Sequence, residues 1–143
     1  MKKYILLLLC LLLVGSGTAS ARKKQVPRMY MFGMAAAFTD TIVHFTNIQT
    51  VDSVWIESKN EFLQNRNAYS YQLRDYLSMQ QMPHRTCIVF YSPKREKLEK
   101  KYQKMRRLYG KDKRGVQHFD IRYITDTEFM FQTVKMEEGQ QDE

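Results

Sequence analysis

Cysteine is scarce in this sequence, and the chain expected after processing keeps only one. The two cysteines are Cys10 and Cys87. Cys10 falls in an apolar N-terminal segment that we expect to be removed, so Cys87 has no internal partner for a disulfide bond. The packing of a hydrophobic core must therefore stabilise the fold, and the remaining length suits one domain.

Long apolar segments are also lacking. No segment approaches the ~20 apolar residues of a membrane-spanning helix, so we expect no transmembrane segment. The longest run, residues 4–14, follows Lys2 and Lys3 and precedes small residues at 19–21. This order is typical of a secretory signal peptide over residues 1–21, cleaved near Ala21. The pattern predicts an exported protein, either periplasmic or secreted.

Signatures of catalysis and of metal or cofactor binding are missing too. The sequence has no GxSxG, P-loop or GxGxxG motif. His44, His84 and His118 lie on separate predicted elements, and the close spacings HxH, HxxxH and CxxC do not occur. We therefore expect no metal, no cofactor and no catalytic residue of a recognised type.

Cys87 is the one candidate nucleophile with a histidine nearby in the sequence. His84 precedes it by three residues, but side chains three apart on a strand point to opposite faces. The apolar neighbours of Cys87 predict a small buried residue rather than a reactive thiolate. The alternative hypothesis is an enzyme of unrecognised type, with a site near the C-terminal end of strand 85–91 and with His84 or Ser92 close to it.

The periodicity of apolar residues predicts one α/β (α+β) domain over residues 29–136. We expect a mixed sheet of about five strands and two main helices, in the order β-β-α-β-α-β-β. The predicted strands cover residues 29–38, 42–48, 85–91, 116–124 and 129–136, and the predicted helices cover residues 68–81 and 93–109. Residues 49–67 have no single period, and their structure is not predicted.

The ends of both helices carry recognisable residues. Asn67 is expected to cap the first helix and Pro83 to end it. Ser92 and Pro93 are expected to be the N-cap and the first residue of the second helix. Free N–H groups at that start could hold an anion; the alternative is that Ser92 caps the helix and Glu96 compensates its dipole.

Segments outside the predicted elements have simple expected roles. Residues 22–28 are expected to form a short basic linker, and residues 137–143 an acidic disordered tail. Within the first strand, Gly33 and the alanines that follow it leave room for a helix or for Trp55 to approach closely.

Positive charge is concentrated in one segment. Residues 94–114 hold eleven Lys or Arg against three Asp or Glu, an excess of +8 that equals the net charge of the whole chain. Apolar residues recur at helical spacing in this segment: Leu98, Tyr102, Met105 and Tyr109. This stripe predicts a helix with one side toward the core and basic residues over the rest.

The basic face of this helix indicates an anionic partner. Like charges four residues apart on a helix are slightly unfavourable unless something compensates them. Nucleic acid is an unlikely partner for an exported protein, so we expect anionic lipid, lipopolysaccharide or acidic polysaccharide. The alternative is a helix face that is simply solvated. The candidate anion-binding residues are Ser92, Lys94, Arg95, Lys97, Lys100, Lys101, Lys104 and Arg107.

Four segments carry a resemblance to known proteins. They are YMFGMAAAF at residues 30–38, VHFTNIQ at 43–49, YQLRDYL at 71–77 and MPHRTC at 82–87. In these segments the chain resembles small exported proteins of Bacteroidetes-type bacteria, to which no activity is assigned. The resemblance implies export and a single domain, and it brings no catalytic residues with it.

The same resemblance implies a modification. Such bacteria O-glycosylate exported proteins at Asp-Ser/Thr-apolar sites. Asp40-Thr41-Ile42 and Asp52-Ser53-Val54 match that pattern, so Thr41 and Ser53 are candidate O-glycosylation sites.

Overall fold

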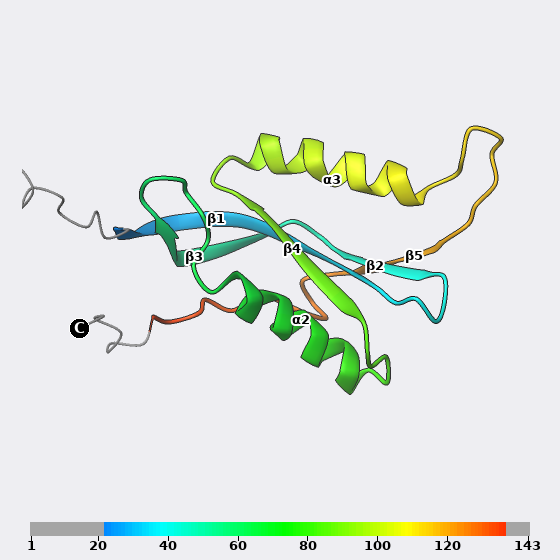
Figure 1. Ribbon diagram of the computed structural model, residues 1–143, viewed down its shortest axis with the longest axis horizontal. Coiled ribbons are helices and arrows are strands. Elements are labelled where there is room, and N and C mark those ends of the chain that lie inside the picture. Colours follow the sequence, from blue (N-terminus) through cyan, green and yellow to red (C-terminus); the bar gives the residue numbers. More distant parts are fainter. Residues whose placement is uncertain (1–21, 137–143) are drawn as a thin grey trace, which may run out of the picture.

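A computed structural model describes residues 22–136 of the chain (Figure 1). Its elements are β1 (Lys23–Ala36), β2 (Ile42–Thr46), β3 (Gln49–Glu57), α2 (Arg66–Met79), β4 (Thr86–Ser92), α3 (Arg95–Tyr109) and β5 (Asp120–Ile124). The predicted α+β domain, a mixed five-stranded sheet with two helices, is confirmed. The predicted signal peptide and acidic tail lie outside the described residues. Within residues 22–136, neither helix is long and apolar enough to cross a membrane.

The long strand β1 organises the sheet. β4 pairs with it antiparallel along one edge, while β2 and β3 pair with it antiparallel along the other. β5 lies beyond β2 and runs parallel to it. The order is therefore β-β-β-α-β-α-β, which differs from the prediction, and β2 with β5 is the parallel pair.

β2 and β3 are two halves of one bent strand along β1. Met34 pairs with Phe45 and Met31 with Gln49, so two residues of β1 oppose three residues between the halves. This is a β-bulge. The N–H of Gly33 donates to Thr46 Oγ1 there at 2.9 Å. The unassigned residues 49–57 thus extend the predicted hairpin.

Both faces of the sheet are covered, with α2 on one and α3 on the other (Figure 1). Side chains of β1 alternate between the two cores, because successive residues of a strand point to opposite faces. Met29 and Met31 pack in the core with α2, and Phe32 and Met34 pack in the core with α3. This double burial explains why β1 is an almost unbroken apolar run.

Gly33 permits the close approach of α2. A Cβ at this position would lie 2.6 Å from Leu73 Cδ2 and 3.0 Å from Phe131 Cζ, distances too short for van der Waals contact. The predicted approach of a helix to Gly33 is confirmed, and the side chain that fills the space is Leu73 rather than Trp55.

The prediction of a basic linker at residues 22–28 is wrong, because residues 23–28 belong to β1. They pair with the end of β3, from Lys23 opposite Glu57 to Arg28 opposite Asp52. Their side chains are mostly exposed, so they show no apolar alternation. The backbone ladder to β3 makes them a strand.

The prediction of a strand at residues 129–136 is also wrong. This segment, the C-terminal strap, crosses the α2 face in extended form without joining the sheet. Side-chain amides take the place of a neighbouring strand. Gln49 Nε2 donates to the Phe129 carbonyl at 2.8 Å, and Gln49 Oε1 accepts from the Phe131 N–H at 2.9 Å. Gln72 makes the same pair of bonds to Gln132.

The first helix starts earlier than expected. Tyr69, Leu73 and Leu77, at the spacing of one helical face, are buried against the sheet. The N-cap is Asn65 instead of Asn67, and its backbone is left-handed with φ 55°. Asn tolerates this conformation better than most residues do, which explains how the N-cap can lie two residues before the predicted one.

Candidate functional site

The basic helix α3 begins two residues later than predicted. Ser92 still pairs with Tyr30 in the β1–β4 ladder, so it cannot be the N-cap, and Lys94 takes that position. Ser92 Oγ accepts a hydrogen bond from the Lys94 N–H at 3.1 Å. Its hydroxyl therefore closes the turn between strand and helix, which corrects the predicted cap.

The rotation of α3 is fixed by its apolar stripe. Leu98 is buried, and Tyr102 packs edge-on against Phe32 with ring centroids 4.9 Å apart. Met105 and Tyr109 pack against the same core. The predicted stripe is confirmed, and it determines which way the remaining side chains of the helix project.

The basic residues of α3 fall into separate groups around the helix. At about 100° per residue, Lys97, Lys101 and Lys104 lie on the flank over β4, and Lys101 Nζ is 5.4 Å from the ring centroid of Phe90 on that strand. Lys100 and Arg107 project away from the sheet.

The opposite flank of α3 is partly neutralised by its own carboxylates. Arg95 pairs with Glu99 at 3.0 Å between Nε and Oε1, whereas Arg106 keeps its charge and donates from Nε to the Tyr123 hydroxyl at 2.9 Å. Glu96 and Glu99, the two carboxylates of the helix, both lie toward this side. Arg95 is therefore not a free cation of the candidate site.

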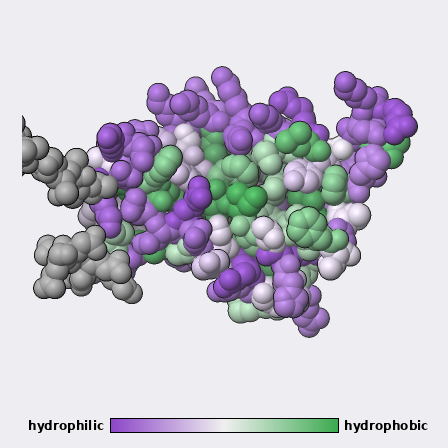
Figure 2. Space-filling view, viewed as in Figure 1, coloured by the Kyte–Doolittle hydropathy of each residue, from purple (hydrophilic) through white to green (hydrophobic). Residues whose placement is uncertain are grey.

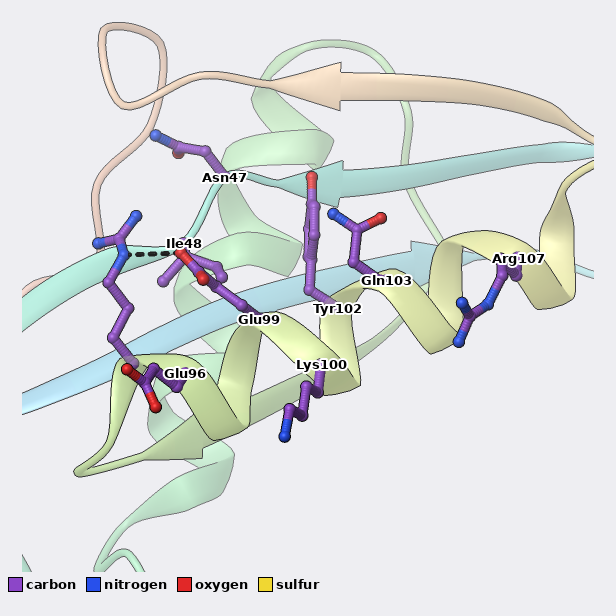
Figure 3. Close-up of a pocket in the computed structure, with 9 residues that line it drawn as sticks. Asn47, Ile48, Glu96, Glu99, Lys100, Tyr102, Gln103 and Arg107 are labelled. Carbon is purple, nitrogen blue, oxygen red and sulfur yellow. Dashed lines mark hydrogen bonds and ion pairs between the residues drawn. The ribbon is translucent and has the colours of Figure 1, made fainter.

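A shallow groove of about 870 Å³ runs along the neutralised flank (Figure 3). It is lined by Asn47, Ile48, Arg95, Glu96, Glu99, Lys100, Tyr102, Gln103 and Arg107. Figure 3 shows Lys100 pointing away from the sheet, while Glu99 meets Arg95 inside the groove. Cations and carboxylates are mixed here, so the groove is not a strongly positive pocket.

Five cations remain together on the outer side of α3. This basic face consists of Lys97, Lys100, Lys101, Lys104 and Arg107. All five side chains are exposed. None of them forms an ion pair with a carboxylate of residues 22–136. Of the predicted residues, the structure thus gathers these five and leaves Ser92, Lys94 and Arg95 at the start of the helix.

Cys87 lacks the surroundings that activate a thiol. Burial raises its pKa to about 11, so the thiol is protonated at neutral pH. His84 is exposed, with φ 61°, and no hydrogen bond joins it to Cys87 within the described chain. Among residues 22–136, no group of three His, Cys, Asp or Glu side chains is arranged to hold a metal ion.

A buried polar cluster that no local sequence pattern predicts lies at the end of the β1–β2 hairpin. Arg85 is buried, forms an ion pair with Asp40 and donates to the Ile42 carbonyl at 3.0 Å. His44 is 4% exposed, and its Nδ1 has no partner in the described chain. Burial, helped by Arg85 and Arg122, lowers the pKa of His44 to about 4.

The cluster had no sequence signal because its members are far apart in the chain. Asp40 and Arg85 are separated by 45 positions. The hydrogen bond from Arg85 holds the pKa of the Asp40 carboxyl below its usual range. The pair joins the β1–β2 turn to the start of β4, which is a structural role.

The two candidate glycosylation residues are exposed at separate places. Thr41 ends the β1–β2 turn, and its carbonyl accepts from the Asp120 N–H at 2.8 Å. Ser53 lies within β3 at φ 54°. Both hydroxyl-bearing side chains are open to solvent.

Comparison with known proteins identifies no family for this arrangement. No protein-family model matches the chain, and neither a curated protein nor a solved structure shows significant similarity to it.

Proposed function

We propose that the chain is an exported, non-catalytic binding domain that contacts an anionic component of the cell envelope through the basic face of α3. The observation that carries this proposal is the set of five exposed cations with no carboxylate partner in residues 22–136. The candidate components are lipid headgroups, lipopolysaccharide phosphates and acidic polysaccharide, which all present repeated negative charge.

The energetics of α3 support a partner outside the domain. Lys97 with Lys101 and Lys100 with Lys104 are like-charged pairs four residues apart, each costing about 0.2–0.5 kcal/mol. Glu96 lies four residues before Lys100 and offsets part of this cost, whereas Glu99 pairs with Arg95 on the other flank. A polyanion seated on the basic face would remove this repulsion.

The start of the described fold is compatible with export. The first residue of the sheet is Lys23, so cleavage after Ala21 would leave every strand intact. An exported protein meets envelope polyanions rather than DNA, which is why the basic face is directed to the envelope in this proposal.

The proposal is tested by binding to vesicles that contain phosphatidylglycerol and to an acidic polysaccharide, with phosphatidylcholine vesicles as reference. The test variant replaces Lys97, Lys100, Lys101 and Lys104 with Gln. Since each lysine near an anionic surface contributes about 1 kcal/mol, affinity should fall at least roughly tenfold. Binding by the unchanged protein should also weaken steeply as salt is raised to physiological strength.

A matched variant controls for net charge. It replaces four exposed lysines outside α3 with Gln: Lys24, Lys59, Lys111 and Lys113. This variant loses the same number of positive charges as the α3 variant. Equal losses of affinity in the two variants would show that net charge, and not the position of the lysines on α3, determines binding. Unchanged affinity of the α3 variant would refute the proposal. The arm that responds, lipid or polysaccharide, identifies the class of partner.

A further inference from the structure

β4 is an edge strand whose outer side is open. Among residues 22–136 it pairs only with β1, and its backbone makes no hydrogen bond to any other described segment. In an antiparallel pair, alternate residues direct their N–H and C=O groups away from the partner strand. The outer side of β4 therefore presents a row of free donors and acceptors.

The sequence of β4 does nothing to block this edge. Proteins usually protect exposed edges with lysine, proline, a bulge or a covering segment. β4 reads TCIVFYS, without a charge or a proline, and its pairing with β1 is regular over all seven residues. Ile88 in its middle is 45% exposed.

The surface over β4 is apolar with a hydrophilic rim. In Figure 2 hydrophobic side chains occupy the middle of the view, where β4 runs in Figure 1, and hydrophilic side chains along α3 border them. The flank of α3 over β4 carries Lys97, Lys101 and Lys104, and Lys101 Nζ lies 5.4 Å from the Phe90 ring centroid. Both carboxylates of α3 lie on the other flank.

We propose that the outer edge of β4 binds an extended acidic peptide segment of another protein as an additional strand. Backbone hydrogen bonds to β4 would supply the general attraction, as in other cases of strand addition. Alternate side chains of the added strand would point toward the α3 layer. Asp or Glu at those positions would meet Lys97, Lys101 and Lys104, which gives the edge its preference for acidic segments.

Charge disfavours the simplest other occupant, a second copy of the chain. Antiparallel pairing of two β4 edges uses a two-fold axis perpendicular to the sheet, so the two α3 helices would lie on the same face. The lysine flanks of the two copies would then oppose each other across the junction. Like charges facing each other are unfavourable, whereas an acidic strand brings the complementary charge.

This inference goes beyond the proposed envelope contact, because it needs the free backbone of β4 as well as the lysines. The probe is a capped eight-residue peptide of alternating Glu and Val, labelled for fluorescence anisotropy at physiological ionic strength. Two further peptides carry N-methyl groups on the Glu amides or on the Val amides. Since only one of the two sets of amides can face β4, one methylated peptide should lose binding and the other should keep it.

Protein variants test the charge preference. Replacing Lys97, Lys101 and Lys104 with Gln should weaken peptide binding roughly tenfold, because each exposed pair contributes up to about 1 kcal/mol. The matched control replaces Lys59, Lys111 and Lys113 with Gln and should change affinity less than about twofold. Hydrogen exchange on the unchanged protein should show new protection of alternate amides within β4 when the Glu-Val peptide is bound.

Several outcomes would overturn the inference. Equal binding of both methylated peptides would show charge attraction without strand pairing. Sedimentation of the free protein as a dimer with protected β4 amides would assign the edge to a second copy. No binding of the unmethylated peptide would also refute it. The vesicles that test the proposed function contain no peptide backbone and cannot pair with β4. A failure of vesicle binding therefore leaves the peptide-binding result unaffected, and a failure of peptide binding leaves the vesicle result unaffected.

Discussion

His44 is buried beside cations that oppose its protonation. Arg85 and Arg122 lie near it, balanced in part by Asp40 and Asp120, and burial is the main reason that its pKa falls to about 4. In the unfolded chain an ordinary histidine titrates near 6.5. Between these two values the unfolded chain binds a proton that the folded chain does not, so folding stability must fall as the pH is lowered.

The expected result is a loss of about 2 kcal/mol in the free energy of unfolding between pH 7 and pH 5, since the slope is about 1.4 kcal/mol per pH unit. Urea denaturation at the two pH values measures it. His44→Leu should remove the slope, whereas His84→Asn, at an exposed histidine, should retain it. A slope unchanged by His44→Leu would contradict this assignment. The Asp40 ion pair adds a separate loss only below about pH 4, because the pKa of that carboxyl is lowered.

At the scale of elements, the C-terminal strap depends on two glutamines that make the same bonds in different surroundings. Gln49 is 5% exposed and bonds the Phe129 carbonyl and the Phe131 N–H. Gln72 bonds the two backbone groups of exposed Gln132. An unpaired buried backbone group costs about 1–3 kcal/mol, whereas water can replace a lost partner at an exposed group.

Gln49→Leu should therefore lower the free energy of unfolding by roughly 2–4 kcal/mol, and the matched change Gln72→Leu should lower it by less than about 1 kcal/mol. Urea denaturation of both variants gives the comparison. Equal losses would mean that burial of the backbone groups is not what makes Gln49 important.

These glutamines also show where sequence patterns stop being informative. Leu98 could be assigned to a buried helix face because helical spacing is a local property. The strap reads as a strand because its apolar residues are spaced like one, and nothing local reveals that Gln49, 80 positions away from Phe129, takes the place of a neighbouring strand. The ion pair of Asp40 with Arg85 was missed for the same reason.

For the candidate site, too, the sequence predicted the features that depend on local spacing and missed those that depend on long-range contacts. Helical spacing indicated which cations of α3 are exposed, and the structure brings Lys97, Lys100, Lys101, Lys104 and Arg107 together. That Arg95 is neutralised by Glu99 required the rotation of the helix against the sheet. That β4 has an open edge required the pairing of strands, which a single sequence does not contain.

At the scale of the whole molecule, the described fold is one sheet held by β1, with a helix on each face. β1 contributes to both cores and pairs with three strands. Its first residues, 23–28, carry no buried side chain, although Val26 is half-buried and packs against the core with α2. Whether they belong to the domain is therefore decided by backbone pairing with β3, and truncation tests this directly.

A chain that begins at Arg22 should be as stable as the full sequence, because no described strand residue is lost and the Arg22 carbonyl still accepts from the Ser58 N–H at 2.7 Å. A chain that begins at Met29 loses the backbone hydrogen bonds to the end of β3. Its free energy of unfolding should be roughly 2–4 kcal/mol lower, because each hydrogen bond contributes about 0.5–1.5 kcal/mol. Urea denaturation of the two truncated chains measures the difference. Equal stability of the two chains would mean that residues 22–28 act as the predicted linker and do not stabilise the domain. The expected loss would establish that the folded domain begins directly after the predicted cleavage position.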